Sequence, residues 1–207
     1  MILPPFILAS ASQTRRTLLD NAGLVFEVDS ADIDERAAEK PLLDAGTAPD
    51  DLAIALAMIK ADNVSHRYPG MMVVGADQTL ELEGERFNKP QDMEAARRQL
   101  LAMRGRTHRL HAALAVARDG ESLWSHVETV SLTMRDLSPP EIGHYLADVG
   151  EAALSSVGAY QIEGRGIQLF DRIDGDFFAI LGFPLLPFLA FLRGNESRSG
   201  TGNGDPT

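Results

Sequence analysis

Cysteine is absent from this 207-residue chain, so a disulfide framework and thiolate chemistry are both excluded. Its absence fits a reducing compartment, and we expect a cytoplasmic location. No uninterrupted apolar run approaches eighteen residues, the length typical of a membrane-spanning helix, so we expect no membrane association. The start, MILPPFILAS, also lacks the basic segment of a secretory signal.

Basic residues are scarce, with 19 Lys and Arg against 30 Asp and Glu and a net charge of −11. A nucleic-acid backbone is bound by neutralising its phosphates, and this surface would repel it. We therefore expect no nucleic-acid partner. A small anionic substrate is still compatible with this charge if positive groups gather in one cleft.

The length and a hydrophobic content of 44% fit one globular domain, which we place at residues 1–193. Residues 194–207 are small and polar and are predicted to be a disordered tail. Strands alternate with helices, and a hairpin with a turn at Asp119–Gly120 interrupts the alternation. The pattern predicts an α/β fold with a mixed sheet.

Four segments position the candidate site residues. FILAS is predicted as a strand, and the helix after it begins at Ser12 as N-cap. LVFEVDSADIDE is predicted as a strand that runs into an acidic loop. TAPDDLAIALAMIK reads as a helix, and MMVVGAD reads as a buried strand that ends at Asp77.

The segment LASASQTRR brings hydroxyls, Arg15 and Arg16 to a strand-to-helix junction. A helix N-terminus suits an anion, and an arginine fork matches phosphate oxygens. The alternative is a capped helix with a solvated basic first turn. Basic groups in a first turn oppose the helix dipole, which favours the anion site.

Lys60 borders the apolar face of its predicted helix, because it follows Leu52 and Leu56 at helical spacing. Such a lysine either extends its charge to solvent or reaches into a cleft. The pattern by itself favours the solvent, because lysines are seldom buried.

Asp77 at the end of a buried strand fits the place where ligands collect in open α/β sheets. A carboxylate there can hold Mg²⁺ beside substrate phosphates or accept a proton from water. Asp34 and Glu35 could add carboxylates from a neighbouring strand end. Each acid alone is as well explained as a loop charge, and the five histidines show no zinc spacing.

Five ordered segments together resemble the Maf family of nucleoside triphosphate pyrophosphatases. They are LASASQTRRTLL, IDE, IKAD, GADQTLELEGERFNKP, and GAYQIEGRGIQLFDRIDGD followed by LGFPL. The resemblance covers residues 6–193. It implies a mixed sheet in two lobes around a central cleft, related to the inosine-triphosphate pyrophosphatase architecture. It also implies hydrolysis of a nucleoside triphosphate to a monophosphate and pyrophosphate with Mg²⁺ or Mn²⁺, in a homodimer.

The resemblance also assigns roles to residues of this chain. Asp77 matches the catalytic acid, and with Glu35 it would hold the metal. Phosphate-binding positions are matched by four residues, namely Ser12, Arg15, Lys60 and Lys89.

Three further positions, Thr14, Gln78 and Glu163, match those that select the base. Gln78 and Glu163 resemble the 7-methyl-GTP branch of the family, whereas Thr14 differs from the tryptophan usual there. The chain therefore matches neither that branch nor the dTTP/UTP branch completely.

Two other functions stay open from the sequence. One is a non-catalytic, nucleotide-binding regulator of cell division. The other is a phosphatase that releases orthophosphate. The joint presence of Asp77, Lys60 and Lys89 favours the pyrophosphatase, because a binding module would not require all three.

Overall fold

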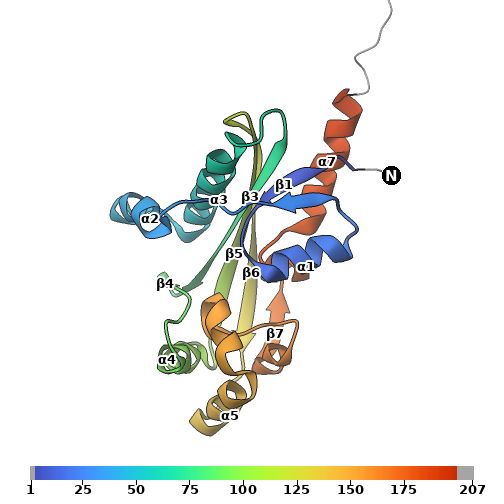
Figure 1. Ribbon diagram of the computed structural model, residues 1–207. Coiled ribbons are helices and arrows are strands. Elements are labelled where there is room, and N and C mark those ends of the chain that lie inside the picture. Colours follow the sequence, from blue (N-terminus) through green and yellow to red (C-terminus); the bar gives the residue numbers. More distant parts are fainter. Residues whose placement is uncertain (1–2, 200–207) are drawn as a thin grey trace, which may run out of the picture.

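A seven-stranded mixed sheet forms the centre of the computed structural model, which describes residues 3–199 (Figure 1). The strands are β1 (Phe6–Ala9), β2 (Phe26–Val28), β3 (Met72–Leu82), β4 (Glu85–Phe87), β5 (Thr107–Arg118), β6 (Glu121–Met134) and β7 (Phe170–Asp174). Their order is β2-β1-β3-β5-β6-β7, and β4 pairs with β3. Strand β1 is parallel to β2 and β3, whereas the other pairs are antiparallel. The predicted α/β class with a mixed sheet is therefore confirmed.

Helices cover both faces of the sheet. They are α1 (Gln13–Asn21), α2 (Glu35–Asp44), α3 (Pro49–Ser65), α4 (Met93–Met103), α5 (Pro139–Val149), α6 (Phe177–Ile180) and α7 (Leu185–Ser199), with 3-10 segments η1 (Gly150–Ser155), η2 (Val157–Ala159) and η3 (Arg165–Leu169). Helices α1 and α7 lie on one side of β1 and β3, and α2 and α3 lie on the other (Figure 1). Helices α4 and α5 gather at the far end of β5 and β6 and form a second lobe with its own core.

The predicted helix cap at Ser12 and the long hairpin are confirmed. The Ser12 side chain accepts the backbone N–H of Arg15. Helix α5 likewise begins with a capping box, formed by Ser138 and Glu141. Between β5 and β6, Asp119 and Gly120 both have positive φ, at 53° and 80°. Such angles are those of a tight hairpin turn whose twist matches its strands.

The prediction that a strand ends at Asp77 is wrong, because β3 continues to Leu82. Pairing with the long strand β5 extends from Val73 to Glu81 and holds this stretch extended. Only the parallel neighbour β1 ends early, with its last pair at Ala9 and Gly75. Asp77 thus lies in the middle of its own strand but beyond the end of its neighbour.

Helix α2 replaces the latter part of the predicted acidic loop. The Asp34 side chain accepts the backbone N–H of Ala37, and Glu35 is the first helical residue. Pro41 lies inside α2, and because a proline normally ends or kinks a helix, this segment is hard to predict as one.

The predicted disordered tail is described only in part. Helix α7 runs to Ser199, and residues 200–207 lie outside the described residues. Among the residues that are described, no helix is both long and apolar enough to cross a membrane.

His108 is buried in the core of the second lobe. Its Nε2 lies 2.7 Å from the hydroxyl of Tyr160, and its ring contacts those of Tyr160 and Phe170. Burial lowers the pKa of His108 from 6.5 to about 4. An unfolded chain therefore binds a proton at this position at a higher pH than the folded protein does.

We predict that His108 makes the folded state less stable in acid. Between pH 6.5 and about 4 the unfolded state binds more protons here, so the free energy of unfolding falls as the pH falls, by about 3 kcal/mol over the window. Urea titrations at several pH values measure it, and His108→Gln should lose this part of the pH dependence. If the free energy of unfolding of the variant fell with pH as steeply as that of the wild type, the assignment to His108 would be contradicted.

Candidate active site

A cleft of about 1200 Å³ lies along an uncovered part of the edge of β3. Strand β1 pairs with β3 as far as Gly75, and β4 pairs with it from Leu80. Both lie along the same edge, because β5 occupies the other one. In the described part of the chain, no strand covers residues 76–79 at this edge. Side chains of adjacent strand residues point to opposite faces, yet both Asp77 and Gln78 line the cleft.

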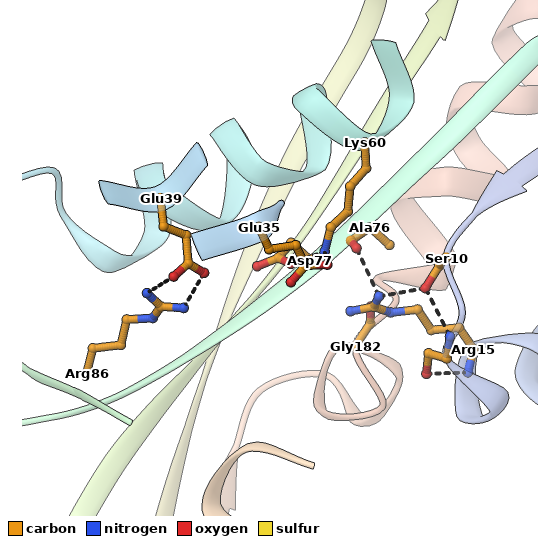
Figure 2. Close-up of polar contacts among 10 residues, drawn as sticks. Ser10, Arg15, Glu35, Glu39, Lys60, Ala76, Asp77, Arg86 and Gly182 are labelled. Carbon is orange, nitrogen blue, oxygen red and sulfur yellow. Dashed lines mark hydrogen bonds and ion pairs between the residues drawn. The ribbon is translucent and has the colours of Figure 1, made fainter. Parts of the chain in front are cut away.

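Lys60 connects two acidic side chains on the floor of the cleft. Its Nζ lies 2.6 Å from Asp77 Oδ1 and 3.0 Å from Glu35 Oε1 (Figure 2). The side chain of Lys60 is only 10% exposed. The interpretation that Lys60 extends to solvent is therefore wrong, and the cleft position implied by the family resemblance is where it lies.

The close packing of α3 on β3 brings Lys60 to Asp77. A Cβ added at Gly75 would lie 2.0 Å from the carbonyl oxygen of Ala57, so helix and strand touch backbone to backbone. Ala53, Ala57 and Ala61 share the helix face that packs on the sheet. This alanine spacing, together with Gly75 two residues before Asp77, is the sequence signal that indicates a buried Lys60.

Asp77 is suited to accept a proton. Burial raises the pKa of Asp77 above its usual range, and Lys60 and Arg15 act in the opposite direction. Glu35 adds a further negative charge that raises the pKa. Asp77 is thus more basic than a solvated aspartate, while the charges of Lys60 and Arg15 favour its ionised form.

We expected Glu35 at the end of a strand, but it lies in the first turn of α2. Its side chain is 55% exposed. Over residues 3–199, no group of three or more acidic or histidine side chains could hold a metal ion. Mg²⁺ is often held by one or two carboxylates together with substrate phosphates. Because Glu35 and Asp77 both contact Lys60 Nζ, they lie close enough together to fit that mode of binding.

Arg15 joins three separate parts of the chain. Its Nη1 donates to Ser10 Oγ and to the carbonyl of Ala76, both at 2.9 Å, and its Nε donates to the carbonyl of Gly182 at 2.8 Å (Figure 2). Ala76 lies on the uncovered edge of β3, so the guanidinium satisfies an acceptor that no strand reaches. The alternative that Arg15 is solvated is therefore wrong. Three protein acceptors already engage much of the hydrogen-bonding capacity of its guanidinium.

The other two predicted phosphate-binding residues also line the cleft. Ser12 caps α1 and accepts the N–H of Arg15 at 3.4 Å. Lys89 is exposed two residues after the end of β4, and within the described residues no ion-pair partner faces it. Its ammonium is therefore available to an anion in the cleft.

The three predicted base-selecting residues all line the same cleft. The Thr14 hydroxyl donates to Glu163 Oε1 at 3.4 Å, although the two residues are 149 positions apart. Gln78 Nε2 donates to the carbonyls of Ala179 and Ile180, both at 3.0 Å. The amide nitrogen of Gln78 is thus engaged with backbone.

Sequence reasoning missed three side chains of the site, namely Ser10, Glu39 and Arg86. Ser10 accepts from Arg15, and Glu39 forms a two-pronged ion pair with Arg86. No local pattern links Glu39 with Arg86, because they lie 47 residues apart. Ser10 belongs to the segment LASASQTRR, whose hydroxyls are a local signal of the site.

Comparison with known proteins gives one family and several relatives. The model of the family described as "Maf-like protein" matches residues 5–195. A protein of Brucella suis named 7-methyl-GTP pyrophosphatase is 58% identical over 187 residues, which are 90% of this chain and 94% of that protein. A Granulibacter bethesdensis protein named nucleoside triphosphate pyrophosphatase is 49% identical over 191 residues, 92% of this chain and 97% of that protein. Among solved structures, the Staphylococcus aureus Ham1 protein aligns at 17% identity with a TM-score of 0.40, over 64% of this chain and 73% of that one.

We predict that Arg15→Lys lowers the free energy of unfolding by about 2 kcal/mol, because a lysine cannot reach all three acceptors and leaves one unpaired. Denaturant titration measures this loss. Arg16→Lys is the matched control from the same helical turn, since Arg16 Nε has no hydrogen-bond partner in the described part of the chain. Equal effects of the two substitutions would contradict the bridging role of Arg15.

Proposed function

Because the chain belongs to the Maf family, we propose that it is a nucleoside triphosphate pyrophosphatase. It cleaves the bond between the α- and β-phosphates of a nucleoside triphosphate and releases a nucleoside monophosphate and pyrophosphate. The pyrophosphatase names of relatives that are 49–58% identical over nine-tenths of this chain support the reaction. The observation that carries the proposal is the contact of Lys60 with both Asp77 and Glu35 on the cleft floor.

In the proposed reaction, water attacks the α-phosphorus and Asp77 accepts a proton from it. The bond from phosphorus to the α–β bridging oxygen breaks, and pyrophosphate leaves with the electron pair. Lys60 and Lys89 offset the charge that develops on the phosphates, and Arg15 adds positive charge from the floor of the cleft. Ser12 and the first turn of α1 bind phosphate oxygens through hydroxyl and N–H groups.

Glu35 and Asp77 would hold a divalent cation, Mg²⁺ or Mn²⁺, which supplies positive charge against the phosphates when it is bound. The chain's own groups then orient the nucleotide and receive the proton. A cytoplasmic location and a homodimer stay predictions.

We further propose that the base is a non-standard or methylated purine, consistent with a role in removing such nucleotides. Thr14 holds the Glu163 carboxylate at the cleft, where it can accept hydrogen bonds from a guanine edge or attract a cationic methylated purine. Gln78 lines the cleft from the face of β3 opposite to Asp77, and because its amide nitrogen is bound to backbone carbonyls, its amide oxygen is the group that would contact the base.

The first experiment identifies the products formed from a panel of triphosphates with Mg²⁺ or Mn²⁺, including 7-methyl-GTP, 5-methyl-UTP and pseudo-UTP. We expect pyrophosphate, and we expect Asp77→Asn to lower kcat by about 10³-fold because a general base is lost. Asp62→Asn is the matched control, since Asp62 lies on the exposed face of α3 and pairs with His66 there.

Pyrophosphate release at near-full rate by Asp77→Asn would contradict the role of that residue. Orthophosphate as the product would identify a different phosphatase. A folded protein with metal present that releases neither product would favour the regulatory function.

We predict that Glu163→Gln changes the order of preferred bases. Replacing the carboxylate by an amide should lower kcat/KM for 7-methyl-GTP relative to UTP by about 10-fold, because a charge-assisted hydrogen bond becomes a neutral one. Competition assays on mixed triphosphates measure the ratio. Thr14→Val, which keeps the carboxylate but removes its donor, should give a smaller change. An unchanged ratio in Glu163→Gln would rule out this residue as a base reader.

A further inference from the structure

Helix α2 carries Glu35 to the cleft without a hydrophobic anchor. None of its side chains is buried, and Pro41 within it removes one backbone donor. A ten-residue helix of this kind depends on tertiary contacts for its stability and position. The ion pair of Glu35 with Lys60 is a weak anchor, because the Glu35 side chain is 55% exposed.

A two-pronged ion pair joins α2 to the hairpin of β3 and β4. Arg86 Nη1 donates to Glu39 Oε2 at 3.0 Å, and Nη2 donates to Glu39 Oε1 at 2.7 Å (Figure 2). The two side chains are only 19% and 15% exposed. Paired donors of this geometry restrict orientation as well as distance, and partial burial limits screening by salt.

Each residue of this ion pair lies close in the chain to a proposed site residue. Glu35 precedes Glu39 by one helical turn, so the two share a face of α2. Lys89 follows Arg86 by three residues along the chain. Glu39 and Arg86 also line the cleft, beside the group formed by Lys60 and its acidic partners.

We propose that Glu39 and Arg86 are positioning residues for the reaction. Their ion pair holds α2 against the hairpin and thereby places Glu35, and through β4 Lys89, at the cleft. Neither residue has to touch the substrate. This inference rests on the proposed function, but the anchoring of α2 can be measured without any substrate.

The test compares three proteins with the wild type. Arg86→Gln breaks the pair, and the charge-swapped double variant Glu39→Arg/Arg86→Glu allows it to form in reverse. Arg98→Gln is the control, because it breaks an exposed pair with Glu94 (3.7 Å) inside helix α4, and neither residue lines the cleft. Hydrogen exchange of the α2 amides and the kinetics of pyrophosphate release are measured for each, with thermal unfolding as a check of the fold.

We expect faster amide exchange over α2 in Arg86→Gln, with the exchange of β3 and β5 unchanged. In the same variant, kcat should fall about 10- to 100-fold with little change in KM, as misplacement of charged groups by about an ångström does. The double variant should recover most of both losses, and Arg98→Gln should behave as the wild type.

Unchanged exchange over α2 in Arg86→Gln would overturn the proposal, and so would faster exchange with wild-type kcat. Failure of a folded charge-swapped variant to recover either property would overturn it as well. A wild-type protein that releases no pyrophosphate, but whose α2 exchange responds as expected, would contradict the proposed function and still support the anchoring.

Discussion

The uncovered edge of β3 over residues 76–79 is the feature on which the rest of the site depends. Strand β1 ends before it and β4 begins after it, so one strand presents side chains from both of its faces to a single cleft. Asp77 faces α3 on one side, and Gln78 faces α6 on the other. Buried backbone acceptors need partners, and at Ala76 the guanidinium of Arg15 replaces the missing strand.

Small residues allow the charged floor of this cleft to form. Gly75 lets α3 approach β3 so closely that Lys60 contacts Asp77 inside the protein. Burying charges is costly unless they are paired, and here one ammonium is shared by two carboxylates. The burial that brings them together also raises the pKa of Asp77. A chain with a net charge of −11 thus concentrates its cations where a triphosphate would need them.

Polar contacts also relate the parts around the cleft to one another. Arg15 reaches Gly182, Thr14 reaches Glu163, and Gln78 reaches Ala179 near the opposite end of the chain. Each of these contacts depends on direction as well as distance. The part proposed to select the base is therefore connected by hydrogen bonds to the helix that would bind phosphate. Helix α1 therefore helps to position both the proposed base-selecting residues and the proposed phosphate-binding residues.

The sequence by itself determined the α/β class, the cap at Ser12 and the hairpin turn at Asp119, because these follow from local patterns and turn geometry. The order of the five segments also identified the family and the candidate residues. Only the tertiary structure decided that β3 continues past Asp77, that Lys60 is buried, and that α2 exists and is joined to β4. These features arise from contacts between segments 17 to 47 residues apart, and a pattern within one segment does not specify the partner that it will meet.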